Sequence, residues 1–151
     1  MKPNLELARQ EDIPLILGMM QRFYAIDSYP FNYETANSNL RTFISNEQLG
    51  RLWIIFFENT PIGYLALTFG FSFEYGGRDA FIDELFIEEN FRNQGIGSEV
   101  MRLVEQQASS LGVKAIHLEV ERSNVKGNRI YLKQGYTSND RTLLTKSIDR
   151  F

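Results

Sequence analysis

Apolar and polar residues alternate along this chain in a way that predicts helices first and a sheet afterwards. Residues 5–8 form a short strand candidate, and the apolar residues after it recur at the spacing of an amphipathic helix. The apolar stripe of this helix consists of Ile13, Ile16, Leu17, Met20, Phe23 and Tyr24. The proline-containing segment 28–32 interrupts the pattern, and a second helix is predicted over residues 33–45.

The middle of the chain has the pattern of an antiparallel sheet. Two apolar runs between residues 52 and 69 flank a polar turn and predict a hairpin. Residues 70–78, rich in aromatic residues and glycine, are expected to form a wide hairpin loop or a lip that faces the substrate. Residues 81–87 are predicted to pair back as the central strand, with Asp83 and Glu84 on opposite faces because strand side chains alternate.

The last third of the chain begins with a third predicted helix. This helix opens at about Ser98, and Gly112 lies where a glycine that ends a helix is expected. Residues 115–121 alternate strictly, which predicts a strand whose polar face carries Glu119.

The chain then closes with a short predicted helix at 126–134 and two predicted strands at 136–137 and 143–148. Taken together, the elements predict an α/β fold of the α+β kind, with one mixed sheet and flanking helices.

Composition narrows the functional classes. A length of 151 residues with 43% hydrophobic content predicts one domain, residues 1–151, with a full core. Zero cysteines and a single histidine, His117, argue against disulfides, a thiol nucleophile and a metal centre. Without an apolar run of about 18 residues or a leader pattern, the chain is expected to be cytoplasmic and not in a membrane. A net charge of −3 without a long basic run argues against nucleic acid and favours a cationic partner.

The stretch 81–97, FIDELFIEENFRNQGIG, carries the strongest candidate chemistry. It places a strand, a loop with Arg92, Gly95 and Gly97, and the start of a helix directly after one another. Backbone N–H groups at the positive end of a helix bind anions such as phosphate. Taken alone, a Gly-x-Gly loop is also explained by simple turn geometry.

A second motif follows, with Asn124, Tyr131 and Gly135 at fixed spacing. Together with the Arg-x-x-Gly-x-Gly loop, it resembles the GCN5-related N-acetyltransferases over nearly the whole chain. Two positions depart from the family pattern, because Gly127 replaces a usual alanine and Tyr136 a usual phenylalanine. Gly127 is expected to weaken its helix by up to about 1 kcal/mol.

The resemblance implies that the cosubstrate is acetyl-CoA, bound without a metal and on a central mixed, mostly antiparallel sheet. The residues implied for its pyrophosphate are Arg92, Asn93, Gln94, Gly95, Ile96, Gly97 and Ser98. The backbone of Phe86, Ile87 and Glu88 is implied to pair with the pantetheine arm as though it were an extra strand, and Asn124 to hydrogen-bond it. The adenosine-side phosphates are implied to meet Lys126, Arg129 and Lys133, which also fit a solvated helix face.

The resemblance also suggests the catalytic groups. Tyr131 matches the residue that stabilises the departing thiolate, although a tyrosine at helical spacing also fits a core position. Glu119 matches the base of protein N-terminal acetyltransferases and ranks first. Asp83 and Glu84 match the acidic pair of diamine and polyamine acetyltransferases and rank second. Each carboxylate can alternatively be solvated or ion-paired.

The expected function is therefore acetyl-CoA-dependent N-acetylation of a primary amine. A small-molecule acceptor of the polyamine, amino acid or aminoglycoside type is favoured over a protein. The alternatives are a protein or peptide acetyltransferase and a non-catalytic acyl-CoA-binding module. A dinucleotide-binding oxidoreductase fails because Val100 stands where its third glycine belongs. A homodimer is possible, because the closing strands of the resembled family commonly pair between subunits.

Overall fold

The computed structural model describes residues 2–149. The chain divides into two compact units, of which the first ends at Leu118 and the second begins at Glu119. That residues 1–151 form one domain stays a prediction. None of the helices in the described part is long and apolar enough to cross a membrane.

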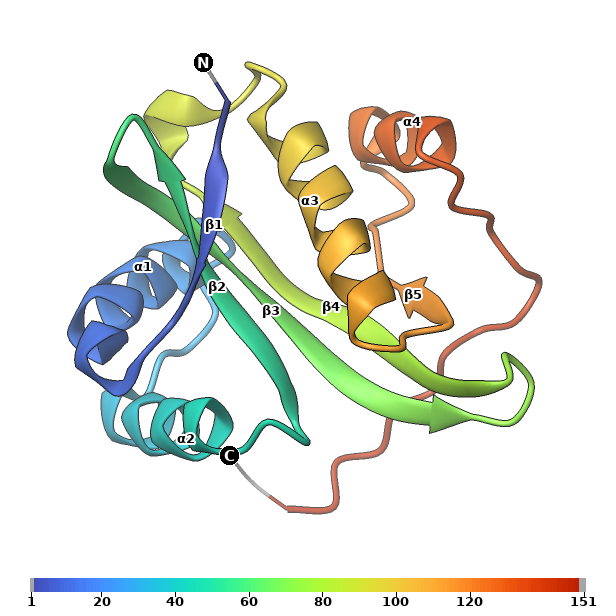
Figure 1. Ribbon diagram of the computed structural model, residues 1–151, viewed down its shortest axis with the longest axis horizontal. Coiled ribbons are helices and arrows are strands. Elements are labelled where there is room, and N and C mark those ends of the chain that lie inside the picture. The colour runs from blue at the N-terminus through green and yellow to red at the C-terminus, as the bar shows by residue number, and fades with distance from the viewer. Residues whose placement is uncertain (1, 150–151) are drawn as a thin grey trace. The chain divides into compact units, whose positions relative to one another are not determined.

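The first unit contains a five-stranded mixed sheet in the order β1-β2-β3-β4-β5 (Figure 1). The strands are β1 (Asn4–Leu7), β2 (Gly50–Phe57), β3 (Thr60–Ser72), β4 (Gly77–Ile87) and β5 (Ala115–His117). The first four are antiparallel to their neighbours, whereas β5 is parallel to β4. The helices are α1 (Ile13–Ile26), α2 (Tyr33–Ser45) and α3 (Ile96–Ser110), with short 3-10 turns at Gln10–Asp12 and Glu89–Phe91.

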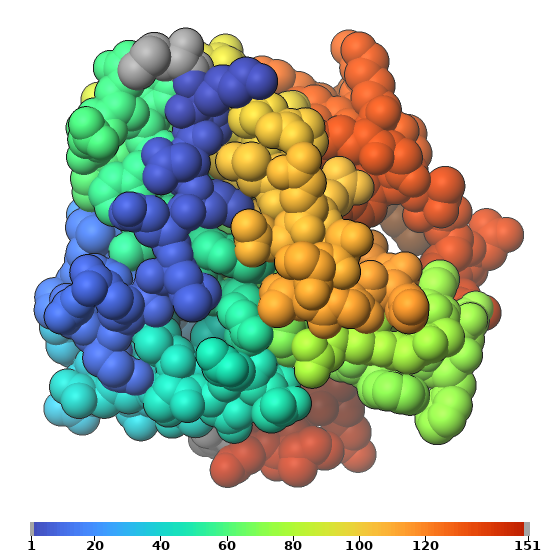
Figure 2. All heavy atoms as spheres, viewed as in Figure 1, coloured from blue at the N-terminus to red at the C-terminus, as the bar shows by residue number. Residues whose placement is uncertain are grey.

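Two hydrophobic layers hold this unit together. On one face of the sheet, α1 and α2 pack against a core that includes Ile54, Tyr64 and Phe86. On the other face, the alternate residues of the strands, such as Leu65 and Leu67, are buried beneath α3. Figure 2 shows α3 beside β1 on the outer surface, where the two elements are in contact. The amphipathic helix predicted from the apolar stripe Ile13 to Tyr24 is confirmed as α1, and the helix predicted at 33–45 is confirmed as α2 at both ends.

The wide loop predicted at 70–78 is wrong. β3 and β4 continue as a hairpin in which Gly70 pairs with Asp79 and Ser72 with Gly77, so that only residues 73–76 turn. Gly70 belongs in a strand because an added Cβ would lie 2.7 Å from an oxygen of the Asp79 carboxylate. Glycine leaves the space that this cross-strand partner fills.

β4 contains a β-bulge at Asp83. Ala66 pairs with Glu84 and the next residue, Leu67, pairs with Ile82, so Asp83 is the extra residue. The strict alternation on which the predicted orientation of Asp83 and Glu84 rested therefore does not hold at this position. Because Ala66 lies in the core beneath α1, its partner Glu84 faces the same side.

The strand predicted at 115–121 is too long. β5 ends at His117, after pairing with residues Asp79, Ala80 and Phe81 of β4. A bulge bends its strand and ends regular pairing, and the bulge of β4 lies just beyond Phe81. Within the described residues, β4 from Ile82 to Ile87 thus has no partner on its β5 side, and Glu119 does not lie on a strand.

The second unit contains one helix, α4 (Val125–Lys133), as predicted to within a residue. The two closing strands predicted at 136–137 and 143–148 are wrong, because residues 134–149 form no strand. Leu143, Leu144 and Ile148 are 64%, 87% and 90% exposed. A strand needs a neighbouring edge to satisfy its backbone groups, and these segments pair with none in the described chain.

Candidate active site

The central strand passes directly into the loop before α3. The Glu88 N–H donates to the Ile62 carbonyl oxygen at 2.7 Å, which holds the end of β4 against β3. The Glu88 carboxylate accepts three hydrogen bonds from Arg22 of α1, at 2.7 to 3.2 Å. This ion pair joins α1 to the end of β4, and it is not predictable from sequence because the two residues are 66 apart.

Arg92 anchors the loop that follows. Its Nε–H donates to the Ile87 carbonyl oxygen at 2.6 Å, and its guanidinium carbon lies 5.6 Å from the centre of the Phe86 ring. The predicted phosphate ligand is therefore bonded to the strand end, and only its two Nη groups carry further donors. Gln94 also makes a local bond, from its side-chain amide to the Asn90 carbonyl oxygen at 2.9 Å.

α3 begins in a way that suits an anion. Gly95 caps the helix with φ +79°, a left-handed conformation that favours glycine, and no side chain in the described part of the chain caps this end. The first backbone bond at the helix start runs from the Glu99 N–H to the Gly95 oxygen at 3.3 Å. The amides of residues 96–98, including Gly97, lie ahead of that bond at the positive end of the helix dipole.

The space in front of these amides is open. A Cβ added at Gly95 would meet no atom within 4 Å, and one added at Gly97 would meet only the Ile87 Cδ1, at 3.7 Å. Gly97 is therefore not required by packing within the protein. This cradle fits a phosphate group that approaches the backbone closely.

Glu84 is the predicted carboxylate whose geometry is best defined. Its Oε2 accepts from the Tyr24 hydroxyl at 2.5 Å and its Oε1 from the Tyr64 hydroxyl at 2.7 Å. Tyr64 is fully buried, whereas Tyr24 and Glu84 are half-buried. Neither tyrosine can be identified from sequence as a partner of Glu84, because each fits an apolar core pattern. A phenylalanine would have fitted equally well.

Burial raises the pKa of the Glu84 carboxyl above its ordinary value. The two phenol hydrogen bonds act in the opposite direction, since they favour the charged form, and Asp83 adds a smaller upward effect. We expect burial to outweigh the hydrogen bonds. Burial and the interaction with Glu84 raise the pKa of both phenols, so the tyrosines stay protonated and donate.

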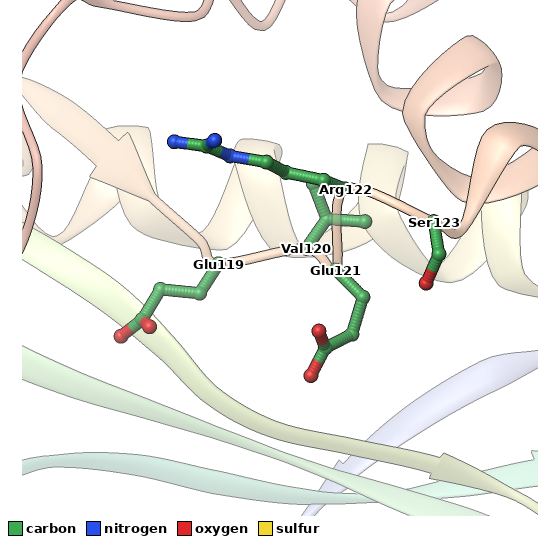
Figure 3. Close-up of a pocket in the computed structure, with 5 residues that line it drawn as sticks. All are labelled: Glu119, Val120, Glu121, Arg122 and Ser123. Atoms are coloured by element: carbon green, nitrogen blue, oxygen red, sulfur yellow. The ribbon is translucent and has the colours of Figure 1, made fainter.

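In the second unit, Glu119 lies in a segment without regular secondary structure. Residues Glu119, Val120, Glu121, Arg122 and Ser123 line a hollow of about 570 Å³. Figure 3 shows the carboxylates of Glu119 and Glu121 on the same side of this segment, with the Arg122 side chain directed elsewhere. The shared side of Glu119 and Glu121 agrees with the alternation predicted for residues 115–121, although this segment is not a paired strand.

Asn124 and Gly127 form the start of α4. The Asn124 Oδ1 accepts from the Gly127 N–H at 2.9 Å and so caps the helix. A Cβ at position 127 would lie 2.5 Å from the Asn124 Nδ2. Glycine in place of the alanine of the family pattern therefore leaves room for the Asn124 side chain to cap α4.

Tyr131 lies on α4, and its ring packs edge-on against Tyr136, with 5.9 Å between ring centres. Burial raises the pKa of the Tyr131 phenol. Lys126, Arg129 and Lys133 are exposed. That Tyr131, Asn124 and Glu119 join the residues of the first unit in one site stays a prediction.

The model of the acetyltransferase (GNAT) family matches residues 19–136 of this chain. Among solved structures, an integron cassette protein from the mobile metagenome of Cole Harbour Salt Marsh is similar with a TM-score of 0.86 and 29% identity, over 97% of this chain and 91% of that chain.

Two more distant solved structures share the fold. A predicted acetyltransferase from Clostridium acetobutylicum, solved with acetyl-CoA, has a TM-score of 0.78 and 20% identity over 95% of this chain and 96% of its own. An aminoglycoside acetyltransferase from an uncultured soil metagenomic sample, solved with trehalose, has a TM-score of 0.77 and 14% identity over 98% and 97%.

Proposed function

The chain belongs to the acetyltransferase (GNAT) family, and from this premise we propose that it transfers the acetyl group of acetyl-CoA directly to a primary amine of a small molecule. One observation supports this most strongly. Among the described residues, the α3 N-terminus has a glycine cradle and no side-chain cap, and it directly follows a strand that has no partner on its β5 side from Ile82 to Ile87. An anion site beside an open strand edge suits a cosubstrate that has both a pyrophosphate and an amide-rich arm.

In this proposal, bound acetyl-CoA supplies an activated acyl group and a thiol leaving group. The amides of residues 96–98 and the Nη groups of Arg92 hold the pyrophosphate. The backbone of Phe86, Ile87 and Glu88 pairs with the pantetheine arm, and Asn124 offers its Nδ2 because its Oδ1 already caps α4. Arg129 and Lys133 interact with the adenosine-side phosphates.

A proton acceptor is required because an alkyl ammonium of pKa about 10.4 is only about one part in 2500 neutral at pH 7, a deficit of about 4.6 kcal/mol. We assign this role to Glu84, ahead of Glu119. The assignment is supported by the two phenol bonds that orient Glu84 and by burial, which makes it more basic than an exposed carboxylate. Glu119 is the alternative base, and Asp83 contributes negative charge.

Tyr131 then stabilises the leaving group. The amine nitrogen forms a bond with the acetyl carbonyl carbon, the carbon–sulfur bond breaks, and its electron pair stays on the sulfur. An ordinary thiolate of pKa about 8.5 is a weaker base than tyrosinate of pKa about 10, so full proton transfer is uphill by about 2 kcal/mol. Burial of Tyr131 increases this difference, which favours a hydrogen bond over complete transfer.

Thermal unfolding with saturating acetyl-CoA tests the cosubstrate. At about 100 times Kd the stabilisation is expected to be near 2.7 kcal/mol, and NAD or ATP should give less. Gly97→Val should abolish the shift by filling the cradle, whereas Ser109→Val, at the exposed far end of the same helix, should keep it. An unchanged melting curve of the parent protein would overturn the proposal.

Release of free thiol with a panel of amines tests the reaction. Polyamines, aminoglycosides, amino acids and short peptides form the panel. Stabilisation by acetyl-CoA without thiol release for any amine would contradict catalysis and favour an acyl-CoA-binding module. The pH dependence of kcat/KM then identifies the base. Glu84→Gln should lose the acidic limb of the profile. If only Glu119→Gln loses this limb, Glu119 is the base, as ranked from sequence.

A further inference from the structure

We propose that the rings of Tyr75 and Phe81, together with Asp79, form a subsite for a second cationic group of the acceptor. The acceptor is then an elongated diamine or polyamine whose reacting amine lies at Glu84. This inference rests on the function proposed above, and it concerns residues of the first unit only.

The register of the sheet places this subsite on the same face as Glu84. Along β3, Ala66, Thr68 and Gly70 face one side because they are two residues apart. Their cross-strand partners on β4 are Glu84, Phe81 and Asp79. Partners directly opposite each other share a face, so these three side chains of β4 lie on the side that α1 and α2 cover further along.

His117 holds the aromatic rings in place. It pairs with Phe81 across β5 and β4, and its ring centre lies 5.1 Å from those of Phe81 and Tyr75. Its Nε2 is 3.0 Å from the Asp79 Oδ2. Phe81 is nevertheless 38% exposed and Tyr75 43% exposed. Fixed rings with accessible surface beside a carboxylate suit recognition of an ammonium group.

The charges on this face favour a cation over a neutral aromatic group. Asp79 and Glu84 both contribute carboxylates, and Asp83 is exposed at the bulge between Glu84 and Phe81. Arg78, the neighbouring cation on β4, is turned to the opposite face, where its guanidinium lies 4.3 Å from the centre of the Phe69 ring and donates to the Leu111 carbonyl oxygen. A neutral ring would bring no positive charge to these carboxylates.

The spacing sets the length of the acceptor. Phe81 and Glu84 are three positions apart, and about 3.3 Å per residue gives a separation of at most about 10 Å. Diaminooctane, with an amine at each end, is long enough to span this distance at its upper limit. Octylamine matches this diamine in length and lacks the second charge, so it is the reference substrate.

The test compares kcat/KM for diaminooctane and octylamine. In the parent protein the ratio should favour the diamine, and Phe81→Leu and Asp79→Asn should each lower the ratio by about 2- to 30-fold. Phe73→Leu is the matched control, because Phe73 is an aromatic residue of the same hairpin that is 93% exposed and packs against Phe71. It should leave the ratio as in the parent.

A second readout does not depend on turnover. His117 is the only histidine in the sequence, so its imidazole NMR signals report directly on the ring cluster. Titration with diaminooctane should shift these signals, and octylamine should shift them less.

Two results would overturn the subsite, and a third would separate it from the proposed function. Equal loss of kcat/KM for both amines in Phe81→Leu would assign a structural role to the ring. A phenyl-bearing monoamine that outperforms diaminooctane and is equally sensitive to Phe81→Leu would identify an aromatic acceptor. If the imidazole signals shift with diaminooctane while the parent acetylates no amine, the subsite holds and the proposed function fails.

Discussion

Replacing Tyr64 with phenylalanine removes one of the two hydroxyl groups that orient Glu84 and changes little else. The Tyr64 side chain is fully buried, and the hydroxyl is its only polar atom, bonded to the Glu84 Oε1 at 2.7 Å. A phenylalanine ring fits the same space. The variant should therefore fold, and its defect should be confined to the ionised form of Glu84.

The magnitude follows from the kind of bond that is lost. A hydrogen bond to a charged group contributes about 1.5 to 3 kcal/mol. Because the hydroxyl stabilises the ionised form, its removal raises the pKa of Glu84 further above the ordinary value. On the acidic limb of the pH profile, kcat/KM should fall by about 10- to 150-fold, since each 1.36 kcal/mol corresponds to a factor of ten. The loss should shrink as the pH rises and Glu84 ionises.

The assay is thiol release from acetyl-CoA over a range of pH, with the best amine of the panel. Tyr24→Phe, which removes the donor to the other oxygen, should give a similar shift of the acidic limb, and Tyr33→Phe, an exposed tyrosine on α2, should give none. An acidic limb at the same pH in Tyr64→Phe and the parent would refute the assignment of Glu84 as the base.

Three further outcomes follow from the structure. Glu84→Gln should increase the free energy of unfolding in alkaline buffer, as measured by urea titration. The raised pKa of Glu84 means that folding favours its protonated form, and this contribution to stability is lost as the pH rises through the folded pKa. The neutral glutamine does not lose it, so the gain over the parent should vanish at acidic pH. Gly127→Ala should destabilise the protein by about 1 kcal/mol through loss of the Asn124 cap, and in an Asn124→Ala background it should instead stabilise by up to about 1 kcal/mol; the same sign in both backgrounds would contradict the cap. Tyr131→Phe should lower kcat by about 10- to 1000-fold with little change in the Kd of acetyl-CoA, and an unchanged kcat would reassign it to the core.

Local chemistry made several features predictable from sequence. The helix at 33–45 begins after Asn32, whose side chain accepts from the Thr35 N–H at 2.9 Å, and ends where the apolar pattern stops. The Gly-x-Gly motif singles out Gly95, and its left-handed φ explains the need for glycine there. Such features depend on neighbours within a few residues, which a sequence displays directly.

Features that depend on distant partners were not predictable. The bonds from Tyr24 and Tyr64 to Glu84 join residues 60 and 20 positions apart. The early end of β5 depends on a bulge in another strand, and the sequence carries no mark of Asp83 as an extra residue. Helix propensity alone predicts that Gly127 weakens its helix, because propensities do not show the Asn124 side chain that occupies the space of the missing Cβ.

The bulge at Asp83 also makes β4 tolerant of a deletion that would ruin a regular strand. Removing one residue from an alternating strand inverts the orientation of everything beyond it. Without Asp83, however, Ile82 would be followed directly by Glu84, and these two already pair with the consecutive residues Leu67 and Ala66. Both halves of the strand would keep their partners and their faces. A chain lacking Asp83 should therefore fold with a straighter β4. Comparison with Asp83→Ala, which loses the same side chain and keeps the bulge residue, separates the effect of backbone curvature on acetyl transfer from that of the carboxylate.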